Sequence, residues 1–333
     1  MKRSALLVVV VLGWLGSACM SSRQNEAEAL ERQIRAMAGV SDTQMEYKSS
    51  IGLGSSLKLA VTLDPSVTDA QAGEVGRVFA DELHRQGFDG HVIDFAVQYP
   101  AAADSAATFH FYETRDAANP ATAKIAEGLE TWLRVARSPI ATQATLRQPE
   151  SGSNDVHQDF TVDLRPQATA AQAEALQRRE PALATATWCI GARQDGPDAA
   201  RHWYCSTPAP PSDHDKDLWD KISAAAGPDN SADGRTAPRS GAVQADTDIG
   251  ITINSSTNTD AATDQVARSV AALLPQFGHP TALVVDTKVY YRNDWSMRSN
   301  TALEIVVGGC YRHQPHHERT PLELELSAMY EKC

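Results

Sequence analysis

The chain has 333 residues, of which 42% are hydrophobic and 22% are charged. These values are ordinary for a globular protein, and they exclude a collagen, a wholly disordered chain and a membrane protein with many spanning helices. The 30 basic and 42 acidic side chains leave a formal net charge of −12. No block of Lys and Arg provides the basic surface that binding to nucleic acid requires, so we expect no nucleic-acid partner.

The first eighteen residues have the composition of an export signal. Lys2 and Arg3 give a basic start, an apolar run extends from Ala5 to Leu15, and small residues follow. This apolar run is shorter than the roughly 20 residues that a transmembrane helix needs. Residues 1–18 are therefore predicted to be a signal peptide.

The signal ends in Ser17-Ala18-Cys19, which resembles the cleavage site of a bacterial lipoprotein. In that family the cysteine becomes the first residue of the mature chain and carries a lipid with two or more acyl chains, which suffices for stable anchoring. The resemblance implies lipidation (diacylglyceryl, palmitate) at Cys19. It also implies a location at the cell membrane, on its extracytoplasmic side. The implied partners are the membrane, through the lipid anchor, and other proteins of the cell envelope.

Residues 19–40 are expected to link the anchor to the first folded domain. Ala27, Leu30, Ile34 and Met37 form one apolar stripe within the segment Asn25–Met37, which predicts a helix. The segment lacks a basic face, so we expect it to pack on the first domain rather than lie on the membrane surface.

An internal repeat indicates how the remaining chain is built. Val61–Ala72 and Val162–Ala173 share the same succession of strand, turn, helix cap and helix, and a looser copy begins at Ile251. Each copy opens with alternating apolar residues, which is typical of a strand with one buried face. Thr68 with Gln71 and Thr169 with Gln172 have the spacing of a capping box.

The order of predicted elements in the first copy is β-α-β-β-α-β, the ferredoxin-like plan. The sequence therefore predicts an α+β protein with three tandem ferredoxin-like domains, as two or three domains are expected at this length. Their boundaries are 41–150, 151–246 and 247–333, and the third ends in a helix that starts at Thr320-Pro321. Residues 226–241, rich in Gly, Asp, Ser and Pro, are expected to form a linker.

Four cysteines remain once Cys19 is assigned to the lipid. A hairpin folded about Pro197 places Cys189 opposite Cys205, and directly opposed strand residues lie close enough for a disulfide. Cys310 then pairs with Cys333. Metal binding is the alternative, but neither pair has metal-finger spacing, and thiols in an exported protein are normally oxidised.

Motifs that would identify a catalytic site are missing from the sequence. There is no phosphate-binding loop, no HExxH zinc helix and no GxSxG nucleophile elbow, so we predict no catalytic residues, no cofactor and no enzyme activity. His313, His316 and His317 are weak candidates for metal ligands, because three imidazoles lie within five residues. Trp203 is a candidate contact residue on the strand face opposite the core.

Two hypotheses for function follow from these features. The favoured one is a non-enzymatic binding or scaffolding lipoprotein that meets its partner through free sheet faces. Val284 and Tyr290 make the predicted free face of the third domain more apolar than the Lys58, Ala60 and Thr62 face of the first, so the third is expected to bind more tightly. The alternative is a metal-binding protein or metal-dependent enzyme that uses His313, His316 and His317.

Overall fold

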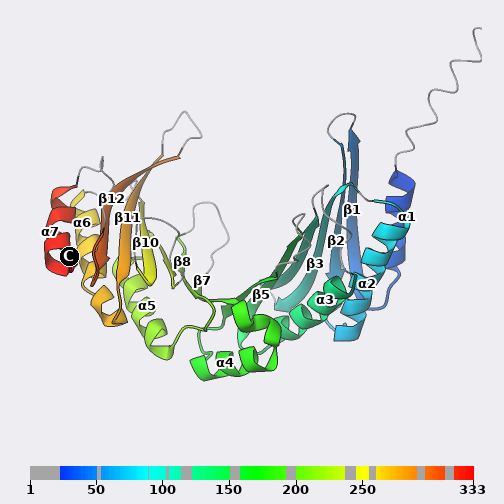
Figure 1. Ribbon diagram of the computed structural model, residues 1–333, viewed down its shortest axis with the longest axis horizontal. Coiled ribbons are helices and arrows are strands. Elements are labelled where there is room, and N and C mark those ends of the chain that lie inside the picture. The colour runs from blue at the N-terminus through cyan, green and yellow to red at the C-terminus, as the bar shows by residue number, and fades with distance from the viewer. Residues whose placement is uncertain are drawn as a thin grey trace, which may run out of the picture. The chain divides into compact units, whose positions relative to one another are not determined.

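The fold is described from a computed structural model of the chain (Figure 1). The residues described are 23–50, 54–88, 90–102, 105–113, 122–150, 158–192, 200–236, 245–254, 260–290, 297–311 and 319–333. The chain divides into two compact units. Unit 1 comprises residues 1–133 and 146–158, and unit 2 comprises residues 134–145 and 159–333.

Within these ranges the structure has seven α-helices and twelve strands. The helices are α1 (Gln24–Arg35), α2 (Asp69–Arg85), α3 (Thr122–Ala136), α4 (Ala170–Arg179), α5 (Asp213–Ala226), α6 (Asp260–Ala271) and α7 (Pro321–Tyr330). Two short 3₁₀ helices are η1 (Pro181–Thr185) and η2 (Leu274–Phe277). The strands are β1 (Val40–Ser50), β2 (Gly54–Leu63), β3 (Val92–Ala102), β4 (Ser105–Glu113), β5 (Ala141–Glu150), β6 (Asp159–Leu164), β7 (Thr187–Ala192), β8 (His202–Ser206), β9 (Ser231–Arg235), β10 (Thr247–Asn254), β11 (Thr281–Tyr290) and β12 (Met297–Val307).

The strands form a mixed sheet in which chain order equals sheet order, from β1 to β12. Strands that follow each other without an intervening helix pair antiparallel, as in β1–β2, β3–β4, β7–β8, β9–β10 and β11–β12. Strands joined through a helix pair in parallel, as in β2–β3, β6–β7, β8–β9 and β10–β11. The protein is thus a mixed α/β molecule, which agrees with the predicted α+β class at that level.

The repeating unit is shorter than the sequence comparison indicates. Pairs of strands begin at residues 40, 92, 141, 187, 231 and 281, and each pair is followed by one helix. The repeat is therefore a ββα element that recurs every 44 to 52 residues. The similarity between Val61–Ala72 and Val162–Ala173 relates every second ββα element, because these two segments lie in β2–α2 and β6–α4.

The three ferredoxin-like domains are not confirmed by this sheet order. In the ferredoxin-like plan the β-α-β crossover is split, so that another strand lies between the two strands that the helix joins. Here β2 pairs directly with β3, from Ser56↔Val92 to Thr62↔Gln98. The order of elements along the chain matches the prediction, but that order does not determine which strands become neighbours.

The predicted linker at residues 226–241 contains a strand, which is a correction to the sequence-based expectation. Its sequence Ser-Ala-Asp-Gly-Arg has low strand propensity, yet β9 pairs with β8 on one side and β10 on the other. Gly234 permits close packing, because a Cβ there would lie 2.6 Å from the Tyr204 ring and 3.1 Å from that of Trp219. Tertiary pairing thus overrides local propensity in this segment.

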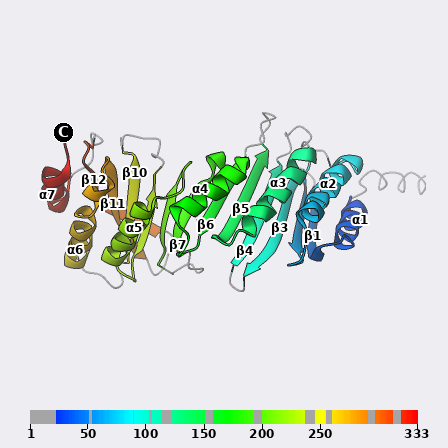
Figure 2. The ribbon, with the colours of Figure 1, turned by 90° about the horizontal axis from the view of Figure 1, so that it is seen from below.

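The core of unit 1 lies between the strands and the helices that pack against one of their faces (Figures 1 and 2). Leu57, Leu59 and Val61 of β2 are buried as the alternation predicts. The Phe79 ring of α2 stacks on Phe95 of β3 with a centroid distance of 3.8 Å. Helix α2 begins with the predicted capping box of Thr68 and Gln71.

The core of unit 2 is built in the same way. Trp188 of β7 and Trp219 of α5 are fully buried, and the Trp219 ring lies 5.6 Å from that of Tyr204 in β8. Thr169 with Gln172 caps α4, and Ser212 with Asp215 caps α5, each through a complete capping box. These boxes fix the helix starts because they satisfy backbone N–H groups that have no partner within the helix.

Candidate functional site

In each unit the described helices pack on one face of the strands (Figures 1 and 2). Side chains alternate along a strand, so burial of Leu57, Leu59 and Val61 puts Lys58, Ala60 and Thr62 on the opposite face. In each unit we call the strand face that lies opposite the helices the free face. The two free faces are the surfaces that the sequence predicts for binding.

The free face of unit 1 carries a charged cluster centred on Asp94. An Asp94 carboxylate oxygen lies 2.6 Å from Nε2 of His110, and the other carboxylate oxygen lies 3.7 Å from Nζ of Lys58. The side chains of His110 and Asp94 are 35% and 26% exposed. A carboxylate bonded to one ring nitrogen orients an imidazole, so Asp94 fixes the orientation of the His110 ring on this polar surface.

Small and aromatic side chains surround the Asp94 cluster. Ala60 of β2 lies beside Ala96 of β3, and Ala96 lies beside His110 of β4. Tyr112, opposite Asp94, is 39% exposed, and its ring lies 6.4 Å from that of His110. The sequence analysis missed this cluster, since its members come from three strands whose register is known only from the fold.

The free face of unit 2 is organised around Trp203. The Arg235 guanidinium carbon of β9 lies 4.9 Å from the centre of the half-buried Trp203 ring of β8, which is a cation–π distance. Trp203 is opposite Gly191 on one side and Asp233 on the other. Asp233 is itself opposite Gly250, where a Cβ would lie 2.8 Å from Oδ1 of Asp233. The glycine therefore leaves room for the Asp233 carboxylate beside the indole.

Both predicted cysteine pairs lie at disulfide distance in unit 2. The sulfurs of Cys189 and Cys205 are 1.93 Å apart, and the two residues are directly opposed in the β7–β8 pair. The sulfurs of Cys310 and Cys333 are 2.04 Å apart. The first pair agrees with the predicted hairpin register, and the second agrees with the assignment of the two remaining cysteines to each other.

Part of the free face of unit 2 is covered by the chain itself. Tyr311 packs with Ala245, Ala282 and Val306 in a small buried cluster over β11 and β12. Burial raises the pKa of Tyr311 well above its ordinary value, and a hydrogen bond with Glu304 raises it further. Val284, next along the free face, stays half-buried.

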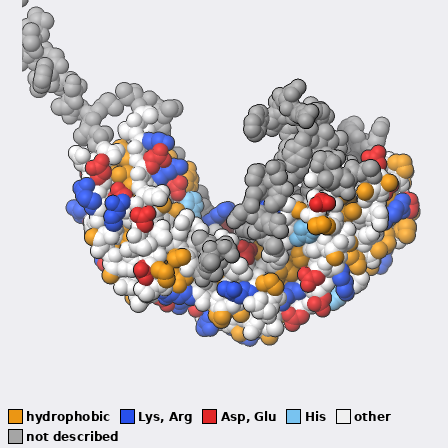
Figure 3. Space-filling model, turned by 180° about the vertical axis from the view of Figure 1, so that it is seen from behind, with side chains coloured by type: hydrophobic (Ala, Val, Ile, Leu, Met, Phe, Trp, Pro, Cys, Tyr) orange, Lys and Arg blue, Asp and Glu red, His pale blue; other side chains and the backbone are white. Residues whose placement is uncertain are grey.

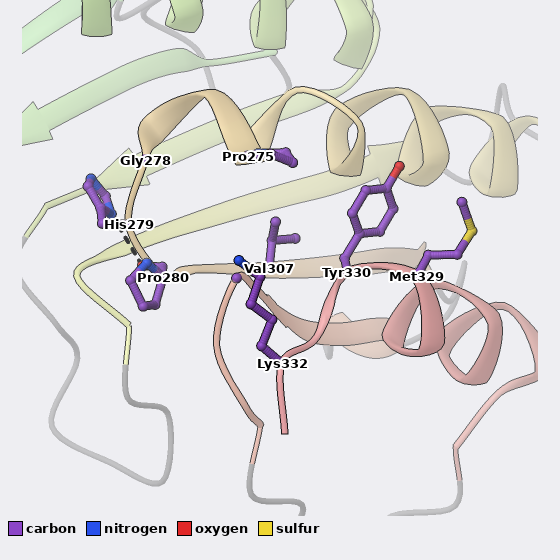
Figure 4. Close-up of a pocket in the computed structure, with 9 residues that line it drawn as sticks. Pro275, Gly278, His279, Pro280, Val307, Met329, Tyr330 and Lys332 are labelled. Atoms are coloured by element: carbon purple, nitrogen blue, oxygen red, sulfur yellow. Dashed lines mark hydrogen bonds between the residues drawn. The ribbon is translucent and has the colours of Figure 1, made fainter.

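Two surface cavities lie in unit 2. One, of about 340 Å³, is lined by the turn after η2, by Val307 at the end of β12 and by the C-terminal residues Met329, Tyr330 and Lys332 (Figure 4). The other, of about 280 Å³, lies between the end of α5 and the side of α6. Both are shallow and mix polar with apolar groups.

Other predicted residues fall outside what the structure describes. Cys19, His313, His316 and His317 lie outside the described residues, and Tyr290 lies in β11 without a described side chain. No group of three or more His, Cys, Asp or Glu that could hold a metal occurs in the parts of the chain that the structure covers. Within the same ranges, none of the helices has both the length and the apolar character needed to cross a membrane.

The visible surface is mixed in charge, and acidic and basic side chains are interspersed in both units (Figure 3). Comparison with protein-family models, with curated proteins and with solved structures finds no match to this chain.

Proposed function

We propose that the protein is a membrane-anchored, non-enzymatic binding protein of the bacterial cell envelope, held by a lipid at Cys19 and bound to its partner through the free face of unit 2. The observation that carries the proposal is the Trp203–Arg235 pair, which lies on the strand face opposite the described helices of unit 2. Trp and Arg are the residues most enriched among those that dominate protein interfaces. The lipoprotein-like ending of the signal peptide, Ser17-Ala18-Cys19, supports the lipid anchor.

The test is site-specific crosslinking in native membranes. A photo-reactive amino acid at position 203 or 284 should form an adduct with a partner, and the same group at Ala175, exposed on α4, should not. The yield at Val284 should exceed that at Thr62, since the third copy is proposed to bind more tightly than the first. Adducts formed only from Ala175, or none at any position, would contradict the proposal.

The metal hypothesis makes a different prediction for the same preparation. A carrier or enzyme that uses His313, His316 and His317 should contain zinc or copper at a ratio near one per chain. That metal should be lost when all three histidines are replaced by Ala. A binding protein should be purified without stoichiometric metal and should keep its crosslinks in chelator.

We also propose that the chain arose by duplication of a segment of about a hundred residues. Each of the three copies would contain two ββα elements. The predicted β-α-β-β-α-β order is the same series read from the second strand of a copy, and in the third copy it ends with the helix. The shared capping boxes at Thr68 and Thr169 support this history.

A further inference from the structure

The two outermost strands of the sheet, β1 and β12, differ in how their outer edges are satisfied. An outer strand presents backbone N–H and C=O groups that can pair with another chain, and natural proteins usually block them. The availability of these edges is independent of the proposed function.

The outer edge of β12 is blocked by the chain's own C-terminal residues. The Thr320 hydroxyl donates to the Ala302 carbonyl at 3.0 Å, and a Glu331 carboxylate oxygen accepts from the Val306 N–H at 3.0 Å. Beyond the strand, the Gly308 N–H donates to the Tyr330 carbonyl at 2.9 Å. The Ala302 carbonyl and the Val306 N–H at this edge are therefore already bonded.

In the part of the chain that the structure describes, the outer edge of β1 is blocked toward its start, where the Val40 N–H donates to the Met37 carbonyl at 3.3 Å. Arg35, at the end of α1, donates to the Thr43 hydroxyl at 2.8 Å and to the Thr43 carbonyl at 2.9 Å. Backbone groups in an antiparallel pair alternate between the partner strand and the outside. Because the Thr43 carbonyl points outward to Arg35, those of Met45, Tyr47 and Ser49 point outward too. No other described residue bonds to these outward backbone groups.

The side chains beside the open edge have a self-complementary charge pattern. Glu46 and Lys48 are 50% and 66% exposed and flank Tyr47. When two such strands pair antiparallel about a two-fold axis at Tyr47, Glu46 lies opposite Lys48 of the second copy, and Lys48 opposite its Glu46. Opposite charges that face each other across a strand pair are favourable, and like charges are not.

We propose that two copies of this chain pair antiparallel through residues 45–49 of β1. The segment contains three outward-facing residues, and their pairing would form about six backbone hydrogen bonds. Arg35 sets one limit of the segment by occupying the Thr43 carbonyl. The interface is small, so the dimer is weak and reversible, with a dissociation constant in the micromolar range or above.

The test measures self-association by sedimentation of the mature chain that carries Cys19→Ala, so that no lipid contributes to association. The unmodified edge should give a concentration-dependent dimer. Glu46→Lys places like charges opposite each other at two symmetry-related positions and should weaken the dimer about ten-fold or more. The double variant Glu46→Lys/Lys48→Glu should restore it, because the exchanged charges again face opposite partners.

Two further variants keep the test specific. Asp42→Lys changes the charge of the same strand equally but lies outside the paired segment, so the dimer should persist. Ser49→Pro removes one outward N–H and leaves the hydrogen bonds to β2 intact, so the dimer should weaken while circular dichroism stays unchanged. A monomer at all concentrations, equal loss in Asp42→Lys, or failure of the charge exchange to restore the dimer would overturn the proposal.

Discussion

A single glycine, Gly191, controls the hairpin that holds Cys189 opposite Cys205. Gly191 has a φ of +101°, and a Cβ there would lie 2.1 Å from the His202 carbonyl oxygen. The clash is with backbone, which cannot move without separating β7 from β8. Gly278 has a φ of +76°, but a Cβ there would meet nothing within 4 Å. A substitution at Gly278 therefore measures the cost of the backbone conformation alone, whereas one at Gly191 measures that cost together with the clash.

Gly191→Ala should lower the free energy of unfolding of unit 2 by about 3 kcal/mol or more, because the clash adds to the conformational cost. Gly278→Ala should cost only about 1–2 kcal/mol, the usual penalty for a left-handed residue with a side chain. Urea denaturation followed by tryptophan fluorescence would measure both variants. Equal losses would show that the close approach to His202 is unimportant.

The alternation of side chains along a strand explains which residues of the candidate site the sequence could predict. Trp203 was predicted to lie opposite the core because it alternates with the core residues of its own strand. Arg235 was not predicted to lie over it, since β9 has a turn-like composition and becomes a strand only between β8 and β10. The Asp94 cluster was missed for the same reason, because strand register is not encoded locally.

At the scale of elements, one side chain links the start of α7 to the edge of β12. The Thr320 hydroxyl accepts from the Glu323 N–H at 3.1 Å and donates to the Ala302 carbonyl at 3.0 Å. Thr320→Ala should therefore lower stability by about 1–2 kcal/mol, because a helix cap and an edge hydrogen bond are lost together. Hydrogen exchange should accelerate in both α7 and β12.

Thr320→Ser is the matched control, because serine keeps the hydroxyl that makes both bonds. It should remain within about 0.5 kcal/mol of the original protein. Faster exchange in α7 alone after Thr320→Ala would mean that the bond to Ala302 does not contribute.

Helix starts were the elements that the sequence predicted best. Thr68, Thr169 and Thr320 each cap the helix that they were expected to cap, because a cap depends on residues only three apart. The sheet order was not predictable in this way. Two strands joined by a helix can be direct neighbours in the sheet, or another strand can lie between them. Both arrangements have the same order of elements along the chain, and contacts between residues far apart in the sequence decide between them.

At the scale of the whole molecule, attachment to the membrane depends on Cys19. If the lipid at this residue is the anchor, Cys19→Ala should move the protein from the membrane fraction to the soluble fraction, since the chain has a net charge of −12 and no basic surface to hold it on anionic lipid. Fractionation and mass spectrometry of the N-terminal peptide would measure this. Unchanged pelleting with an unmodified N-terminus would contradict lipidation.

Disulfide reduction should affect the two compact units differently. Both bonds lie in unit 2, and they close sequence separations of 16 and 23 residues, whereas the described part of unit 1 contains no cysteine. By the chain-entropy estimate each bond contributes about 3 kcal/mol by restricting the unfolded chain. Reduction should therefore lower the stability of unit 2 while that of unit 1 stays unchanged, because the unfolded chain gains conformational freedom only where a loop was closed.

Hydrogen exchange with and without a phosphine reductant would resolve the units by peptide. Faster exchange is expected in β7, β8, β12 and α7, with β2, β3 and α2 unaffected. The paired variant Cys189→Ala/Cys205→Ala should reproduce the effect around β7 and β8 without reductant, and Cys310→Ala/Cys333→Ala should reproduce it around β12 and α7. Equal acceleration in both units would mean that they unfold as one cooperative body, because loss of the bonds in one would then be transmitted to the other.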